Sequence, residues 1–261
     1  MTDVRHSIEK IAGCNVSVQR GGVGQPLLYL HGAGGGNRWL PFMEMLSKSF
    51  EVIVPEHPGF GPSDTPEWLD NVGDLAYFYL DFIEQMRLDQ VHLVGTSLGG
   101  WIAAELAVRN QNKLRTLTLV AAAGIHVAGV PKGDIFLWSR EELTRNLFYN
   151  QELAEATLRL ELSPEEMDFR IKNQLTMAKL AWQPRMHNPH LVKWLHRITV
   201  PTLIVWGAED KVIPAQYGPA FRDLIPNSRL EVLSQCGHFP QVEKTAEFVG
   251  VVTRFLQGAG R

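Results

Sequence analysis

The stretch Gly95-Thr96-Ser97-Leu98-Gly99-Gly100 decides how this chain folds and where its chemistry lies. It follows the apolar run at residues 91–94 directly, and it precedes a segment whose apolar residues have helical spacing. A G-x-S-x-G pattern at a strand-to-helix junction predicts a tight turn that strains the serine backbone and leaves room only for glycines two residues away. The turn would hold the Ser97 hydroxyl beside a helix N-terminus, whose free N–H groups favour negative charge.

Short apolar runs alternate with helical patterns on both sides of this turn. Continuous apolar runs are typical of parallel strands covered on both faces, and they predict strands at 15–19, 27–30, 52–54, 91–94, 117–120, 203–205 and 229–233. Helical spacing predicts helices at 39–47, 72–86, 98–109, 215–224 and 245–256. Such alternation implies right-handed crossovers, so we expect an α/β fold with a doubly wound, mostly parallel sheet.

The pattern changes between about residues 125 and 197, where strand-like runs vanish and charged helical segments replace them. The sequence Ser-Pro-Glu-Glu at 163–166 predicts a helix start, with serine as N-cap, proline in the first turn and glutamate at the capping-box position. Strand patterns return at residue 202. We therefore expect a core formed by residues 1–124 and 198–261, with residues 125–197 as a helical insertion.

Composition narrows the classes of function. A chain of 261 residues fits one large α/β domain with an insertion, and 25 Lys and Arg against 28 Asp and Glu give a net charge of −3. This balance offers no broad attraction for nucleic acid or anionic membrane. Cys14 and Cys236 lack metal-ligand spacing, and the N-terminal residues lack the apolar stretch of a signal peptide. We expect a cytoplasmic monomer or homodimer with a small-molecule substrate and no metal or organic cofactor.

Three loops that follow predicted strands supply partners for Ser97. The glycine-rich loop 31–36 follows the strand at 27–30 and could present a backbone N–H toward the serine, with His31 expected to stabilise it through hydrogen bonds. Asp210 lies just beyond the strand at 203–205, with Glu209 and Asp64 as rival acids. His238 follows the last strand, and the chain order Ser…Asp…His is one that supports serine hydrolysis.

With these motifs the sequence resembles the α/β-hydrolase fold superfamily over essentially its whole length. The resemblance is carried by His31-Gly32, by Pro-Gly-Phe-Gly-Pro-Ser at 58–63, by the 95–99 turn, by 207–210 and by Gly237-His238. It implies a sheet of about eight strands, with the helical insertion as a lid. Glu56 is a departure, because similar proteins often carry aspartate there; we expect it to affect loop geometry more than chemistry.

The resemblance also implies roles for individual residues. Ser97 would be the nucleophile, Asp210 the acid and His238 the base, with oxyanion donors in the backbone N–H groups of Leu98 and of Ala33 or its neighbour Gly34. Cys236, two residues from His238, is better explained as a small buried filler than as a nucleophile. Side chains expected to contact the substrate are Trp138, Trp182, Phe239, His126 and Arg185.

Three functions remain open at this point. The leading hypothesis is a serine hydrolase that cleaves an ester or related acyl bond of a small, largely apolar substrate. The second is carbon–carbon hydrolysis, as in meta-cleavage-product hydrolases; those typically have Asn before the nucleophile and Trp after the histidine, where this chain has Thr96 and Phe239. In that case Arg170 or Arg185 would bind a substrate carboxylate. The third is a ligand-binding or sensor protein that retains the fold.

Overall fold

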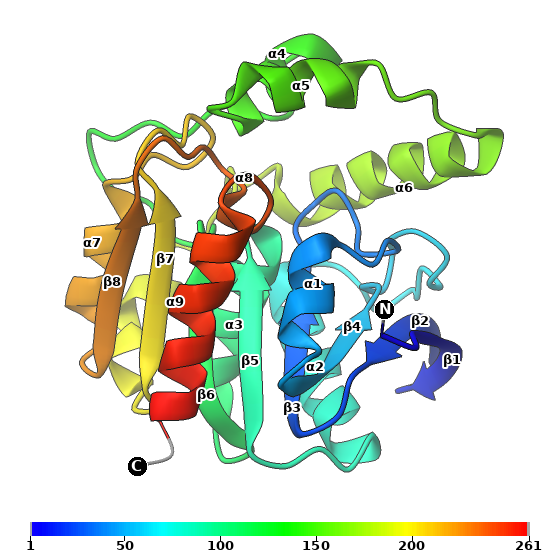
Figure 1. Ribbon diagram of the computed structural model, residues 1–261, viewed down its shortest axis with the longest axis vertical. Helices are drawn as coiled ribbons and strands as arrows, with labels where there is room; N and C mark the ends of the chain where they lie inside the picture. Colours follow the sequence, from blue (N-terminus) through cyan, green and yellow to red (C-terminus); the bar gives the residue numbers. More distant parts are fainter. Residues whose placement is uncertain (1, 260–261) are drawn as a thin grey trace.

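The computed structural model describes residues 2–259, and its centre is one sheet of eight strands (Figure 1). The strand order is β1-β2-β4-β3-β5-β6-β7-β8. Strand β2 pairs antiparallel with β1 and β4, and all other neighbours pair in parallel. The strands are β1 (Arg5–Ile11), β2 (Cys14–Gly21), β3 (Gln25–Leu30), β4 (Phe50–Pro55), β5 (Val91–Thr96), β6 (Leu114–Val120), β7 (Thr202–Gly207) and β8 (Ser228–Leu233).

Helices cover both faces of the sheet, which explains the continuous apolar strand runs. Along β3, Leu28 and Leu30 belong to the core cluster that includes residues of α2, α3 and α7, whereas Leu27 and Tyr29 belong to the cluster that includes residues of α1 and α9. Figure 1 shows α1 and α9 on one face and α2 and α3 on the other. The bounds are α1 (Pro41–Leu46), α2 (Val72–Gln85), α3 (Leu98–Arg109), α7 (Tyr217–Leu224), α8 (Pro240–Glu243) and α9 (Thr245–Gly258).

The expected doubly wound, mostly parallel α/β sheet is thus confirmed, and the seven predicted strands are β2 to β8. Strand β1 was not predicted, because its residues are mostly exposed and only Ile11 at its end is fully buried. The short helix α8, which directly follows Phe239, was not predicted either. Both elements lack the long apolar pattern from which strands and helices are predicted.

The chain between β6 and β7 forms helices that lie beyond the carboxyl ends of the parallel strands (Figure 1). The expected cap of α6 is confirmed, because the Ser163 hydroxyl accepts the Glu166 N–H at 3.2 Å and the Glu166 carboxylate accepts the Ser163 N–H at 2.9 Å. The elements of this segment are α4 (Arg140–Leu147), α5 (Gln151–Leu158), α6 (Pro164–Ala181) and two 3₁₀ turns, η1 (Leu191–Lys193) and η2 (Leu195–Arg197). Within residues 2–259, no helix combines the length and apolar character that crossing a membrane would need.

Candidate active site

Ser97 occupies the sharp turn between β5 and α3. Its φ of 55° and ψ of −112° lie in a region that serine rarely adopts, a strain of order 1–3 kcal/mol. A Cβ on Gly95 would lie 2.2 Å from the Gly99 carbonyl oxygen, and one on Gly99 would lie 2.0 Å from the Leu30 carbonyl oxygen. The two glycines therefore let the turn pass close to its neighbours, as the sequence predicts.

The strained turn is held from the neighbouring strand. The Ser97 N–H donates to the Val120 carbonyl at 2.9 Å, and the Ser97 carbonyl accepts from Ala123 at 3.1 Å and from Trp101 at 3.1 Å. The Ser97 hydroxyl makes no capping bond to α3, although Ser97 is the N-cap residue. The hydroxyl is thus not committed to the helix.

Asp210 and His238 form a buried hydrogen-bonded pair. The His238 Nδ1 lies 2.8 Å from Asp210 Oδ2, and Asp210 Oδ1 accepts from the N–H groups of Val212 at 2.8 Å and Ile213 at 2.9 Å. With three hydrogen bonds the carboxylate is fixed in orientation. Because Nδ1–H donates to the carboxylate, the other ring nitrogen, Nε2, is left to accept a proton.

The rival acids bind elsewhere. Glu209 Oε2 accepts the Cys236 N–H at 2.8 Å, and Asp64 Oδ2 accepts the Asn15 N–H at 2.9 Å. Burial raises the pKa of the Cys236 thiol to about 12, so this side chain stays a neutral thiol and behaves as the expected buried filler. Asp210 is therefore the acid that the fold brings to the histidine.

Ser97 and His238 lie on the wall of one cavity of about 470 Å³. Within residues 2–259 no hydrogen bond joins the Ser97 hydroxyl to the His238 ring. Catalytic hydrogen bonds are often long in a free enzyme and tighten only when substrate is bound. The cavity therefore holds both the hydroxyl of Ser97 and a histidine that could act as its base.

Backbone donors face the same region. Leu98 is the first residue of α3, and Ala33 and Gly34 line the cavity. A Cβ on Gly32 would lie 3.4 Å from the Ser97 Cβ, so this glycine-rich loop runs close beside the serine. In residues 2–259 the N–H groups of Leu98, Ala33 and Gly34 have no protein acceptor, which leaves them free for a ligand oxygen.

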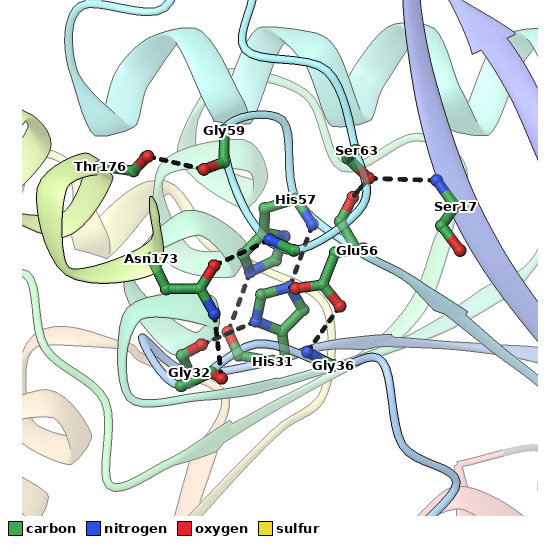
Figure 2. Close-up of polar contacts among 12 residues, drawn as sticks. Ser17, His31, Gly32, Gly36, Glu56, His57, Gly59, Ser63, Asn173 and Thr176 are labelled. Atoms are coloured by element: carbon green, nitrogen blue, oxygen red, sulfur yellow. Dashed lines mark hydrogen bonds and ion pairs between the residues drawn. The ribbon is translucent and has the colours of Figure 1, made fainter. Parts of the chain in front are cut away.

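Two stacked histidines hold the start of the loop (Figure 2). The His31 Nδ1–H donates to the Gly32 carbonyl at 2.7 Å, and His31 Nε2 accepts the His57 N–H at 3.0 Å. The His57 ring stacks on His31 with centroids 3.6 Å apart, and its Nε2–H donates to the His31 carbonyl at 2.9 Å. Burial holds the pKa of His57 well below its usual value, and the electrostatic effect of His31 lowers it further. The His57 ring is therefore neutral, and both rings support the loop through hydrogen bonds, the role expected for His31.

Glu56 holds the other end of the loop. Its Oε2 accepts the Gly36 N–H at 2.8 Å, and Gln19 Nε2 donates to the Gly36 carbonyl at 2.7 Å. Cβ atoms on Gly35 or Gly61 would each lie 2.9 Å from Glu56 Oε1. The carboxylate thus fits between two glycine-containing loops, in keeping with the expected effect of Glu56 on loop geometry.

The cavity separates the predicted substrate contacts into two groups. Trp138, Trp182 and Phe239 line it. His126 is exposed and away from the wall; Arg185 ion-pairs with Asp134 at 3.5 Å and lies 4.0 Å above the Trp182 ring centroid. The other wall residues are mainly apolar side chains of the β6–β7 segment, including Phe136, Leu143, Leu147, Leu175, Met177 and Met186.

Two polar residues of α6 on the wall stand out. Arg170, which the sequence offered as a carboxylate binder, lines the cavity and pairs with no carboxylate in residues 2–259. Asn173 is buried beside it and was not predicted. The capping box at the start of α6 sets which of its residues share a face. Asn173 lies three positions before Thr176 and on the same face, and this spacing of two polar residues was the signal that could have found Asn173. In residues 2–259 no group of His, Cys, Asp and Glu side chains has the geometry of a metal site.

The sheet, the strained serine turn and the acid–histidine pair define an α/β enzyme with hydrolase architecture. A family model described as "alpha/beta hydrolase fold" matches residues 25–245, and the chain belongs to this family. It is 29% identical to 2-hydroxymuconate semialdehyde hydrolase of Pseudomonas sp. (strain CF600), over 95% of this chain and 92% of that protein. It is 26% identical to Lipase 3 of Moraxella sp. (strain TA144), over 90% of this chain and 78% of that protein.

A solved structure adds to these likenesses. A mutant of the meta-cleavage product hydrolase of Pseudomonas fluorescens IP01 superposes with a TM-score of 0.80 at 25% identity, covering 97% of this chain and 98% of that one. The match extends over the β6–β7 segment as well as the sheet, since nearly the whole chain is covered. The chain is an α/β hydrolase, and the proteins it resembles include meta-cleavage product hydrolases as well as lipases.

Proposed function

We propose that the protein is a serine hydrolase that cleaves an ester or related acyl bond of a small, largely apolar substrate. The observation that carries this proposal is the Asp210–His238 hydrogen bond on the wall of the cavity that holds Ser97. A serine hydroxyl is a poor nucleophile until a base removes its proton, and His238 is the base within the same cavity. The lining, with its tryptophans and aliphatic side chains, suits an acyl or aromatic group.

In this proposal the Ser97 Oγ attacks the substrate carbonyl carbon while His238 Nε2 takes the hydroxyl proton. Asp210 stabilises the resulting imidazolium. The oxyanion accepts hydrogen bonds from the N–H of Leu98 and of Ala33 or Gly34, each worth about 3 to 4 kcal/mol by analogy with other serine hydrolases. His238 then protonates the leaving group, which departs and leaves an acyl-enzyme. Water attacks the acyl carbon while His238 takes its proton, and that proton returns to Ser97 Oγ as the carboxylic acid is released.

The helical segment at 125–197 would act as a lid over Ser97. Its side chains make up much of the cavity wall, so closure of α4 and α6 over a substrate would remove water from the reacting atoms. The substrate is then a small molecule that enters between lid and core. The cytoplasm is the expected location and a monomer or homodimer the expected state.

A second candidate is carbon–carbon hydrolysis of a meta-cleavage product. Arg170 favours it, because an arginine that lines an apolar cavity and pairs with no carboxylate in residues 2–259 suits a substrate with one carboxylate end. Relatives named for this chemistry agree. Two features favour the ester reaction: the Thr96 hydroxyl lies 3.1 Å from the Tyr29 hydroxyl within the core, and Phe239 packs on Phe148. Neither residue offers the cavity the polar group that Asn and Trp would supply.

The test is a substrate panel with Ser97→Ala as the blank. p-Nitrophenyl esters of increasing acyl length are compared with one yellow meta-cleavage dienol, whose loss of colour reports carbon–carbon cleavage. We expect ester turnover that Ser97→Ala abolishes, and labelling of wild type by an organophosphonate. Faster dienol turnover would favour the second candidate. Equal activity in Ser97→Ala, or no turnover with ligand-dependent thermal stabilisation, would reject the mechanism.

A further inference from the structure

We propose that Asn173 is a positioning residue that holds the oxyanion loop, residues 32–36, in its working conformation from the helical segment above it. Asn173 lies in α6, outside the sheet and far in sequence from the loop it contacts. The inference rests on the proposed serine mechanism. It adds a device by which the lid and the oxyanion donors depend on each other.

The Asn173 amide joins two loops. Its Nδ2 donates to the Gly34 carbonyl at 3.1 Å, and its Oδ1 accepts the Gly61 N–H at 2.8 Å. Figure 2 shows the side chain between the loop that carries Gly32 and Gly36 and the loop that carries Gly59. Asn173 is only 6% exposed, so water competes little for these bonds.

The loop needs this contact because, in the part of the chain that the structure describes, no hydrogen bond from the sheet holds the middle of the loop, where Ala33 only packs against the core. His31 binds Gly32 at one end, and Glu56 with Gln19 binds Gly36 at the other. The Gly34 carbonyl receives its one side-chain hydrogen bond in residues 2–259 from Asn173. Four of the five residues at 32–36 are glycine, which leaves the backbone more conformations than any other residue would.

Gly35 leaves space for the Asn173 side-chain amide. Its φ is 96°, and a Cβ there would lie 2.9 Å from Asn173 Nδ2. Only a glycine therefore lets the amide reach the Gly34 carbonyl. Holding that carbonyl fixes the peptide plane next to the Gly34 N–H and, through one more residue, the Ala33 N–H. These are the two donors that the mechanism assigns to this loop.

The consequence is coupling between lid and chemistry. An outward movement of α6 would break the Asn173–Gly34 bond and release the oxyanion donors, whereas closure would restore both. Donor placement matters steeply, because displacing a reacting or stabilising group by about 1 Å can lower a rate about 100-fold. The effect would fall on the transition state, since the oxyanion forms only there.

The matched variants are Asn173→Asp and Thr176→Val. Aspartate keeps the shape of asparagine and can still accept from Gly61, but it offers the Gly34 carbonyl an oxygen in place of an N–H. Thr176 lies one turn along the same helix, and its hydroxyl donates to the Gly59 carbonyl at 2.6 Å. Thr176→Val thus removes a bond from α6 to the core without touching the oxyanion loop.

With p-nitrophenyl butyrate, Asn173→Asp should lower kcat roughly 10- to 100-fold with little change in KM. The inhibition constant of a trifluoromethyl ketone, whose adduct carries an oxyanion, should rise by the same factor. Thr176→Val should keep both constants near wild type, even where its melting temperature falls. If Asn173→Asp is too unstable to purify, Asn173→Ala replaces it with the same expectations.

The outcomes separate this inference from the proposed function. Loss of activity in Ser97→Ala together with wild-type kcat and inhibitor affinity in the Asn173 variant would overturn the positioning role alone. Equal losses in the Asn173 variant and Thr176→Val would also overturn it, because they would show only that α6 must stay attached. Wild-type activity in Ser97→Ala would remove the serine mechanism itself.

Discussion

Glu243 Oε1 accepts the N–H of Gly237, the residue before His238, at 2.7 Å. The other oxygen of the same carboxylate accepts the N–H groups of Tyr149 and Asn150 at 2.8 Å each. A second bond joins the same regions, since the His238 N–H donates to the Leu147 carbonyl at 2.8 Å. The histidine loop and the α4–α5 connection are therefore held as one unit.

Glu243→Gln should destabilise that unit. The amide has the same shape but turns one acceptor oxygen into a donor that faces backbone N–H groups. We expect the free energy of unfolding to fall by about 1 to 3 kcal/mol, measured by urea denaturation. Glu67→Gln, at an exposed loop position, serves as the control and should stay within about 0.5 kcal/mol of wild type. Equal stability of the two variants would contradict a joining role for Glu243.

Asp210→Asn should nearly abolish turnover while leaving the fold intact. The N–H groups of Val212 and Ile213 require an acceptor, so the amide oxygen stays with them and the NH₂ faces His238 Nδ1. The ring proton then moves to Nε2, which can no longer accept the Ser97 proton. We expect kcat to fall roughly 10⁴-fold, as the same change does in serine proteases.

The neighbouring acid supplies the control for that variant. Glu209→Gln keeps an oxygen that can accept the Cys236 N–H, so its kcat should stay within a few-fold of wild type. Circular dichroism checks that both variants are folded. A kcat for Asp210→Asn close to that of Glu209→Gln would show that Asp210 does not orient the base.

The sequence could predict the sheet from local patterns, and these also placed Asp210 and His238 just after strands, while the family resemblance favoured Asp210 over Glu209 and Asp64. Buried parallel strands have continuous apolar runs in their sequence, and each loop with a candidate site residue follows such a run directly. The serine turn is equally local, since Gly95 and Gly99 lie within two residues of Ser97. Parallel pairing of the strands then brings the loops to one edge of the sheet.

Contacts made by α6 could not be predicted in the same way. Asn173 meets Gly34 across 139 positions of sequence, and its partner is a backbone carbonyl that no side-chain pattern marks. Arg185 and His126 show a different difficulty. A charged or aromatic residue between β6 and β7 is an attractive substrate contact, but Asp134 and Trp182 engage Arg185. His126 is exposed, with its ring centroid 5.4 Å from that of His187. Whether such a side chain reaches the cavity depends on which face of its segment it occupies and on the side chains that pack against it.

The stability of the fold should decline in mild acid because of His92. This strand residue is fully buried, with Nδ1 2.8 Å from the Thr116 hydroxyl and Nε2 3.0 Å from Gln25 Oε1. Burial is the main cause that lowers the pKa of His92 to about 4, and the positive charge of Arg115 adds to the shift. Between pH 6.5 and about 4 the unfolded chain binds a proton that the folded chain does not, so stability falls as the pH falls. Above pH 6.5 this contribution is complete.

The measurement is the free energy of unfolding at several pH values from 7.5 to 4.5. His92→Gln should show a shallower decline than wild type, with a difference of up to about 3 kcal/mol across the window. His6→Gln, at an exposed position of β1, is the control and should follow the wild-type curve. Parallel curves for all three proteins would assign the acid sensitivity to other groups.

Arg170→Gln should change which substrates bind without changing how they react. Arg170 lines an apolar cavity. Burial lowers the pKa of its guanidinium and the nearby charge of Arg140 lowers it further, but an arginine stays protonated at neutral pH. The mono-p-nitrophenyl ester of glutaric acid carries a carboxylate at the end of its acyl chain; p-nitrophenyl valerate has the same chain length and no charge. For the charged ester KM should rise roughly 10- to 100-fold, the effect of losing a hydrogen bond to a charged group.

The neutral ester should show an unchanged KM with the same variant. Arg185→Gln is the control, because Asp134 and the Trp182 ring already engage that guanidinium. If Arg170→Gln leaves the KM of both esters unchanged while Arg185→Gln raises the KM of the charged ester alone, the carboxylate is bound by Arg185 instead. A rise in KM for both esters with Arg170→Gln would mean that this residue supports the cavity wall through its aliphatic stem, and that the site has no preference for a carboxylate.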